Sequence, residues 1–169
     1  AEIMLLTHGS ENINEDNWNL NKDLISNLIR NLFIGRQKHH VGLVVYSTSV
    51  GDTIGLDPYK DAFNLTNFAN SLIHPGLGAN TAIGLKKLRN VFNTQSRTGA
   101  PKIGIVITDQ SSTDTAATKQ EAEQAQREGI ILISVGIGGN INPRELQTLS
   151  SSERYINRVN AFTQLQLLM

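Results

Sequence analysis

The chain has 169 residues, 39% of them hydrophobic, which is typical of one folded domain with a sizeable core rather than of a disordered segment. Its 15 basic and 15 acidic residues cancel and form no run of like charge, so composition gives no electrostatic footprint for nucleic acid. No apolar run approaches the roughly 20 residues of a membrane-spanning helix, and we predict no membrane insertion. The absence of cysteine excludes disulfides and thiolate metal sites within these residues.

Apolar runs and helical periodicity alternate along the chain. Continuous apolar runs predict buried strands, and a turn at Gly51 precedes a shorter candidate strand; in chain order these strands are 2–6, 41–46, 52–56, 103–108, 130–135 and 155–159. Apolar positions at helical spacing, with capping residues before them, predict helices at 18–33, 61–72, 80–92 and 118–127, a short helix opening at Pro143, and another at 161–168. Because the strands are apolar runs separated by helices, we predict a Rossmann-like α/β sandwich. Its central sheet has about six mostly parallel strands with helices on both faces.

No composition shift, repeat or linker divides the chain, so residues 1–169 are predicted to form a single domain. The chain opens directly on a predicted strand without a signal-like segment. We therefore expect it to be a domain excised from a larger multi-domain protein.

Polar side chains follow two of the predicted strands. Asp109 ends the run at 102–109, and His8, Ser10 and Asn12 follow the first strand. Ligands of open α/β sheets bind outside the carboxyl ends of the strands, so we expect these side chains to meet there.

Five segments, in order and at the right spacing, resemble a von Willebrand factor type A domain. They are 41–50 (VGLVVYSTSV), 78–85 (GANTAIGL), 105–109 (IVITD), 133–138 (ISVGIG) and 162–165 (FTQL). The resemblance covers essentially the whole chain and is strongest to extracellular-matrix members such as the N-terminal A domains of collagen VI. It implies that one edge strand, 52–56, is antiparallel.

The resemblance also implies a location for a metal-ion-dependent adhesion site (MIDAS). The family's Asp-x-Ser-x-Ser motif, aligned on Gly9 and Ile13, falls on His8, Ser10 and Asn12. An alternative frame places Thr7, Gly9 and Glu11 there, and neither frame restores the first Asp.

The two remaining positions of the motif fall elsewhere in the chain. The family's Thr falls on Ala79, with Thr81 two residues away, and its final Asp falls on Asp109. Mg²⁺ prefers carboxylate and hydroxyl oxygens, whereas His8 offers nitrogen, which suits Zn²⁺ better. We therefore predict a degenerate site with no resident cofactor and at best weak Mg²⁺ binding.

Other motifs do not indicate an enzyme. The Gly-x-Ser-x-Gly elbow of hydrolases is absent, and the glycines at 136, 138 and 139 do not meet the dinucleotide fingerprint. A loose basic cluster at Lys22, Arg30, Arg36 and Lys38 is read as a solvated face, with a weak site for an acidic partner as the alternative. The triplet Asn64-Leu65-Thr66 is an N-glycosylation sequon, which makes Asn64 a candidate acceptor in a secreted protein.

From the resemblance we expect a non-catalytic, secreted module of the extracellular matrix, acting in collagen VI-like assembly or cell adhesion. Its expected partners are other matrix proteins or neighbouring A domains. Two alternatives stay open at this point. One is a metal-dependent adhesion domain that holds Mg²⁺ through Ser10, Asn12, Thr81 and Asp109; the other is an intracellular scaffold domain of the same family.

Overall fold

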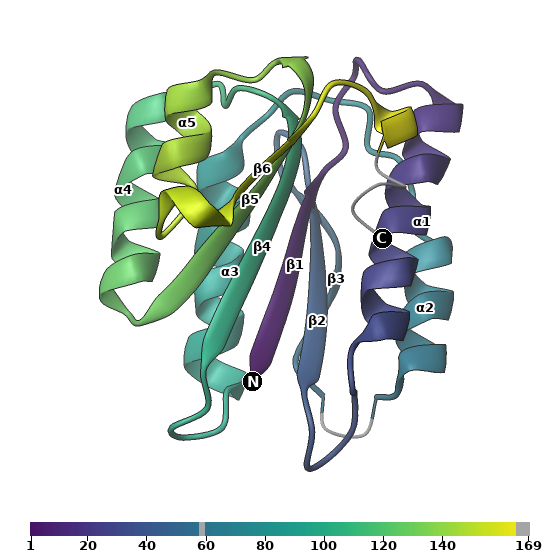
Figure 1. Ribbon diagram of the computed structural model, residues 1–169, viewed down its shortest axis with the longest axis vertical. Coiled ribbons are helices and arrows are strands. Elements are labelled where there is room, and N and C mark those ends of the chain that lie inside the picture. Colours follow the sequence, from purple (N-terminus) through teal and green to yellow (C-terminus); the bar gives the residue numbers. More distant parts are fainter. Residues whose placement is uncertain (58–59, 165–169) are drawn as a thin grey trace.

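The computed structural model describes residues 1–57 and 60–164. Within them, six strands form one sheet in the order β3-β2-β1-β4-β5-β6 (Figure 1). All neighbouring strands are parallel except β2 and β3. The strand bounds are β1 Glu2–His8, β2 His40–Tyr46, β3 Val50–Ile54, β4 Lys102–Gln110, β5 Ile130–Asn140 and β6 Ile156–Val159. The predicted fold class and the antiparallel edge strand are thus confirmed.

The edge strand begins two residues earlier than predicted. The backbone N–H of Ser47 donates to the carbonyl of Ser49 at 2.9 Å, so the chain reverses immediately after β2. Gly51, which was predicted to form the turn, therefore lies inside β3.

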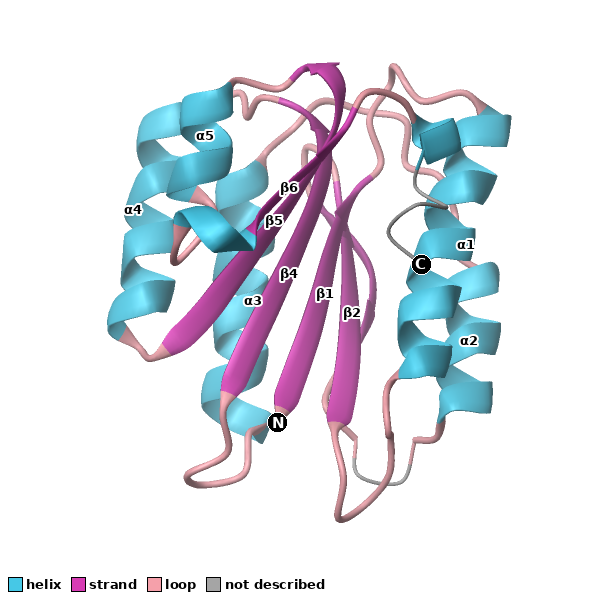
Figure 2. Cartoon of the chain, in the orientation of Figure 1, coloured by secondary structure: helices cyan, strands magenta, loops and turns pink. Residues whose placement is uncertain are grey.

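Helices cover both faces of the sheet (Figure 2). On one face lie α1 and α2, and on the other lie α3, α4 and α5; the bounds are α1 Glu15–Asn31, α2 Ala62–Asn70, α3 Thr81–Gln95, α4 Thr115–Arg127 and α5 Pro143–Thr148. Each begins after an Asn or Asp whose side chain accepts a backbone N–H of the first turn: Asn14, Asp61, Asn80, Asp114 and Asn142. This capping satisfies N–H groups that have no partner within the helix.

The core has two halves, one on each face of the sheet. Because side chains alternate along a strand, Ile3 and Leu5 of β1 pack on the α1 side, whereas Met4 and Leu6 pack on the α3 side. All seven residues of β1 are buried. A Cβ on Gly84 of α3 would lie 3.0 Å from Leu6, so glycine lets α3 approach the sheet closely.

The last predicted helix is described only in part. Glu153–Tyr155 form a 3-10 turn, η1, before β6, and residues 162–164 form another. The rest of the predicted helix at 161–168 lies outside the described residues. No helix within the described ranges has the length and apolarity required to cross a membrane.

Candidate functional site

The carboxyl ends of β1 and β4 bring three predicted site residues together. Asp109 accepts a hydrogen bond from Ser10 Oγ through Oδ2 at 2.7 Å, and its Oδ1 lies 2.9 Å from Nδ1 of His8. The chain forms this contact because β1 and β4 are adjacent and parallel, so both strands end at the same edge. We call this group, with the loops around it, the carboxyl-edge site.

The imidazole of His8 is buried and faces oxygen on two sides. Its Nε2 lies 3.3 Å from the carbonyl of Gly78, opposite the nitrogen that meets Asp109. Its ring stacks on Tyr46, with the centroids 5.0 Å apart. Side-chain exposure of His8 is 0%, so Asp109 and the Gly78 carbonyl replace water as its partners.

Tyr46 links His8 to another predicted site residue. Its hydroxyl lies 3.2 Å from Oγ1 of Thr81, the first residue of α3. Burial raises the pKa of Tyr46 well above its usual range, so this hydroxyl stays protonated at physiological pH. Sequence reasoning did not identify Tyr46, because it was read as one more apolar residue of a strand.

The loop after α2 closes over this group. The backbone carbonyl of Ser10 lies 2.8 Å from Nε2 of His74, whose ring stacks on Trp18 of α1 at 5.0 Å. A Cβ on Gly9 would lie 2.3 Å from the ring of Pro75, so the loop touches the backbone of residue 9. Through its contacts with Trp18 and Ser10, His74 holds the loop in place.

The remaining predicted positions occupy different environments. Asn12 is exposed, and its amide donates to Oε1 of Gln110 at 2.7 Å. Ala79 is buried, and its carbonyl accepts from both the backbone and the hydroxyl of Thr113. Within the described residues, neither Ala79 nor Thr81 forms a hydrogen bond with Asp109.

The side chains of Thr7 and His8 have different surroundings. The hydroxyl of Thr7 accepts a hydrogen bond from Asn21 of α1 at 2.8 Å, away from Asp109. His8 and Ser10, in contrast, both contact Asp109. Of the two sets of residues, the one that begins at His8 therefore supplies the side chains that contact Asp109.

These side chains do not fit the ligand set of a hard divalent cation. Both carboxylate oxygens of Asp109 are engaged by protein groups, and the hydroxyl of Ser10 also accepts the backbone N–H of Asn12 at 3.0 Å. Ala79 has no side-chain oxygen, and Mg²⁺ requires near-octahedral oxygen ligands. In the described part of the chain, no three His, Cys, Asp or Glu side chains come together as a metal-binding group.

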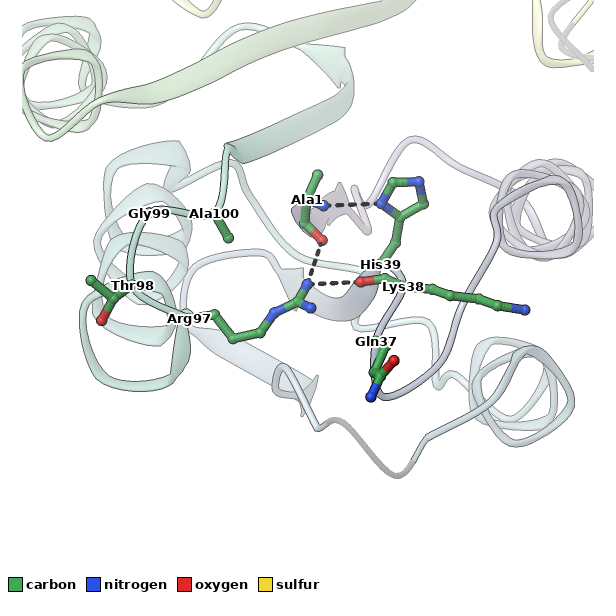
Figure 3. A pocket seen from close by; sticks show the side chains of 8 residues that line it. All are labelled: Ala1, Gln37, Lys38, His39, Arg97, Thr98, Gly99 and Ala100. Carbon is green, nitrogen blue, oxygen red and sulfur yellow. Dashed lines mark hydrogen bonds between the residues drawn. The ribbon is translucent and has the colours of Figure 1, made fainter.

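A cavity of about 430 Å³ lies at the opposite edge of the sheet. Figure 3 shows Arg97 reaching across it to the carbonyls of Ala1 and Lys38, at 3.4 and 2.8 Å. Beside it, Nδ1 of His40 lies 3.3 Å from a carboxylate oxygen of the buried Glu2. His40 is only 4% exposed, because its position on β2 pairs with the buried Glu2 on β1.

Comparison with known proteins assigns the fold to a family. The von Willebrand factor type A domain profile matches residues 2–169. The chain belongs to the von Willebrand factor type A domain family. Human matrilin-1 is 30% identical over 160 residues, which cover 92% of this chain and 32% of matrilin-1. Mouse collagen alpha-4(VI) chain is 29% identical over 156 residues, which cover 92% of this chain but 7% of the collagen.

One solved structure is similar to the domain in both fold and sequence. Proximal thread matrix protein 1 from the mussel byssus, in a form whose MIDAS motif is occupied by zinc, superposes with a TM-score of 0.91. The two are 26% identical, and the match covers 99% of this chain and 46% of the mussel protein. The chain thus spans less than half the length of each of these three relatives.

Proposed function

We propose that this domain is a non-catalytic protein-interaction module of the extracellular matrix that recognises its partner without a metal ion. In this proposal its MIDAS is degenerate at His8, Ser10, Asn12, Ala79, Thr81 and Asp109. It acts in matrix assembly or cell adhesion as part of a larger secreted protein. Its partners are other matrix proteins or neighbouring A domains.

The main observation in favour of recognition without a metal ion is the contact between His8 and Asp109. A ligand carboxylate must present free oxygens to a dication, yet Asp109 is only 7% exposed and its oxygens face His8 and Ser10. Binding a metal there requires the imidazole to move out of a buried stack with Tyr46. Leaving a buried polar group without its hydrogen-bond partner costs about 1–3 kcal/mol, which opposes metal entry.

Two kinds of observation support the matrix role. The relatives that match nearly the whole chain are matrilins and collagens, together with a thread matrix protein of the byssus. A non-catalytic role is supported by the geometry of His8, Ser10 and Asp109. Both His8 and Ser10 bond the same carboxylate, so the hydroxyl donates to Asp109 and is not oriented by a histidine base.

The partner surface in this proposal is the rim of the carboxyl-edge site. Ile73 and Leu77 are 73% and 49% exposed and belong to the loop that closes over Ser10. Exposed Glu11 and Asn12 follow β1, and the backbone N–H of Glu11 donates to the carbonyl of Leu77 at 3.2 Å. An apolar rim beside exposed polar groups suits a protein partner better than a small ligand.

Thermal unfolding tests the absence of a metal. Metal-stripped protein is scanned with and without millimolar Mg²⁺, Mn²⁺, Ca²⁺ or Zn²⁺, because a ligand that binds only the folded state raises the unfolding temperature. We expect no shift with any of the four ions. A rise of several degrees that is lost in Asp109→Asn contradicts the proposal and favours metal-dependent adhesion.

The zinc-dependent alternative has one specific observation in its favour. The mussel relative holds zinc in its MIDAS motif, and His8 places imidazole nitrogen at this site. A shift with Zn²⁺ alone, abolished by His8→Ala, identifies that alternative.

Adhesion of the domain to decellularised matrix tests whether the rim of the carboxyl-edge site is the partner surface. Binding of the wild-type domain is expected to be the same in chelator and in Mg²⁺, and to fall in the Leu77→Asp variant. Phe33→Asp is the matched control, because Phe33 is 75% exposed but lies beyond the far end of α1. Equal loss in both variants contradicts the assigned surface.

A further inference from the structure

The sequon Asn64-Leu65-Thr66 occurs once in the sequence and lies in the first turns of α2. Asn64 is exposed, and its backbone N–H donates to the capping carboxylate of Asp61 at 2.8 Å. Leu65 and Thr66 are 1% and 8% exposed. The helix thus presents the acceptor amide to solvent and buries the other two residues of the triplet.

The hydroxyl of Thr66 determines when the sequon can be modified. Its Oγ1 is buried and has no hydrogen-bond partner within the described residues. The enzyme that modifies a sequon must contact this hydroxyl, because the Ser or Thr at the third position defines the motif. Once α2 is packed against α1, the enzyme cannot reach it.

We propose that Asn64 carries an N-linked glycan and that the glycan is attached before α2 packs onto α1. In this step the side-chain amide nitrogen of Asn64 bonds to the anomeric carbon of a lipid-linked oligosaccharide. The lipid pyrophosphate leaves as that carbon–oxygen bond breaks, and the amide proton passes to a base of the enzyme. The inference does not depend on how the carboxyl-edge site recognises its partner.

The surroundings of Asn64 accommodate a sugar chain. Phe63, the preceding residue, is 72% exposed and offers an aromatic face to the apolar side of a sugar ring. Beside it is a groove of about 320 Å³, lined by four polar and two apolar residues: Arg30, Thr66, Asn67 and Asn70, and Ala62 and Phe63. A glycan here covers an otherwise exposed Phe63.

The position of α2 keeps such a glycan away from the carboxyl-edge site. The helix begins at the end of the molecule opposite that edge and runs beside α1 on the same face of the sheet (Figure 1). A glycan on its first turn therefore leaves the rim at Ile73 and Leu77 accessible. It also marks the face around Phe63 as one that does not bind a protein closely.

Secretion from mammalian cells tests the modification. The intact mass of the wild-type domain is measured before and after peptide N-glycosidase treatment in ¹⁸O-water, which labels the released acceptor as aspartate. We expect loss of one glycan mass and a label at Asn64. An unchanged mass for the secreted wild-type domain overturns the proposal.

Two variants make this result specific. Asn64→Gln removes the acceptor, whereas Thr66→Val removes the sequon but preserves the buried shape. Because the Thr66 hydroxyl has no partner, its loss is not expected to destabilise the fold. Both variants are expected to be secreted without a glycan, and a glycan retained on either one overturns the assignment.

A second experiment tests the timing. Folded domain from bacteria and a peptide of residues 60–72 are offered separately to microsomes that contain the transferase. We expect the peptide to be modified at least about tenfold faster, because the folded domain must open locally to expose Thr66. Equal rates for the two substrates contradict attachment before packing.

Discussion

His8 and Asp109 lie 101 residues apart in the sequence, and their side chains meet at 2.9 Å in a buried contact. The family motif has a carboxylate at the position of His8, according to the alignment on Gly9. An imidazole there gives Asp109 a buried protein partner. The contact therefore bears on both the stability and the ligand chemistry of the carboxyl-edge site.

Asp109→Ala should lower the free energy of unfolding by about 3 kcal/mol, because it leaves the buried imidazole of His8 without its acceptor. Urea unfolding followed by tryptophan fluorescence measures this change through Trp18. Asn12→Ala is the control, since it removes an exposed hydrogen bond to Gln110 and should change stability by less than about 0.5 kcal/mol. Equal effects of the two substitutions contradict the importance of the buried pair.

A triple variant, His8→Asp with Asn12→Ser and Ala79→Thr, should gain a metal site. It supplies the carboxylate and hydroxyl oxygens that the family motif places around Asp109, and these are ligands that Mg²⁺ and Mn²⁺ prefer. We expect millimolar Mn²⁺ to raise its unfolding temperature by several degrees and to leave the wild type unchanged. The triple variant with Asp109→Asn added is the control, and it should lose the response.

Gly9→Ala should destabilise the domain by about 2 kcal/mol, because the added Cβ falls 2.3 Å from the ring of Pro75. The displaced loop also carries Leu77, so binding to matrix should fall in parallel. Gly139→Ala is the matched control, since no atom lies within 4 Å of its added Cβ. Thermal unfolding of the two variants compares them directly, and similar unfolding temperatures would show that the loop adapts without cost.

Stability should fall in acid through the pair of Arg89 and Glu128. The pKa of Glu128 is lowered from 4.5 to about 2, and the main cause is its hydrogen bonding with Arg89. A carboxylate with a lowered pKa in the folded state stabilises the protein above its unfolded pKa, and this stabilisation is lost as the pH falls from about 4.5 toward 2. The expected loss is on the order of 2 kcal/mol.

Unfolding at pH 7 and pH 3 measures this loss. In Glu128→Gln the difference between the two pH values should shrink by that amount. Glu123→Gln is the control, because Glu123 makes only longer pairs of 3.8 and 3.9 Å on an exposed helix face. If the stability difference between pH 7 and pH 3 is unchanged in Glu128→Gln, another carboxylate is responsible for the loss of stability in acid.

The strands were the most predictable part of the fold. The continuous apolar runs at 103–108 and 130–135 lie within β4 and β5, because strands of a parallel sheet covered on both faces have no polar side to show. Strand ends were less predictable. β5 continues to Asn140, past glycines that carry no hydrophobic signal. β3 begins two residues before its predicted start, because the turn after β2 is tighter than the position of Gly51 suggested.

The meeting of three polar side chains at the carboxyl edge could be predicted from the sequence. The rule that parallel strands end at one edge predicted that His8, Ser10 and Asp109 meet, and the distances confirm it. It could not predict the contacts of His74, since these depend on the path of the loop after α2 rather than on any local pattern. Whether these residues form a degenerate metal site stays a prediction for the metal scans.

The strands β1 and β4 are neighbours in the sheet but far apart in the sequence, and this has a consequence for folding kinetics. The ends of β1 and β4 can meet only after the chain has closed a loop that contains α1, β2, β3, α2 and α3. Contacts of such high sequence separation are entropically costly and slow to form. A nascent or partly unfolded chain therefore lacks the assembled carboxyl-edge site. Under the proposed function, a chain that binds its partner has already completed the central sheet.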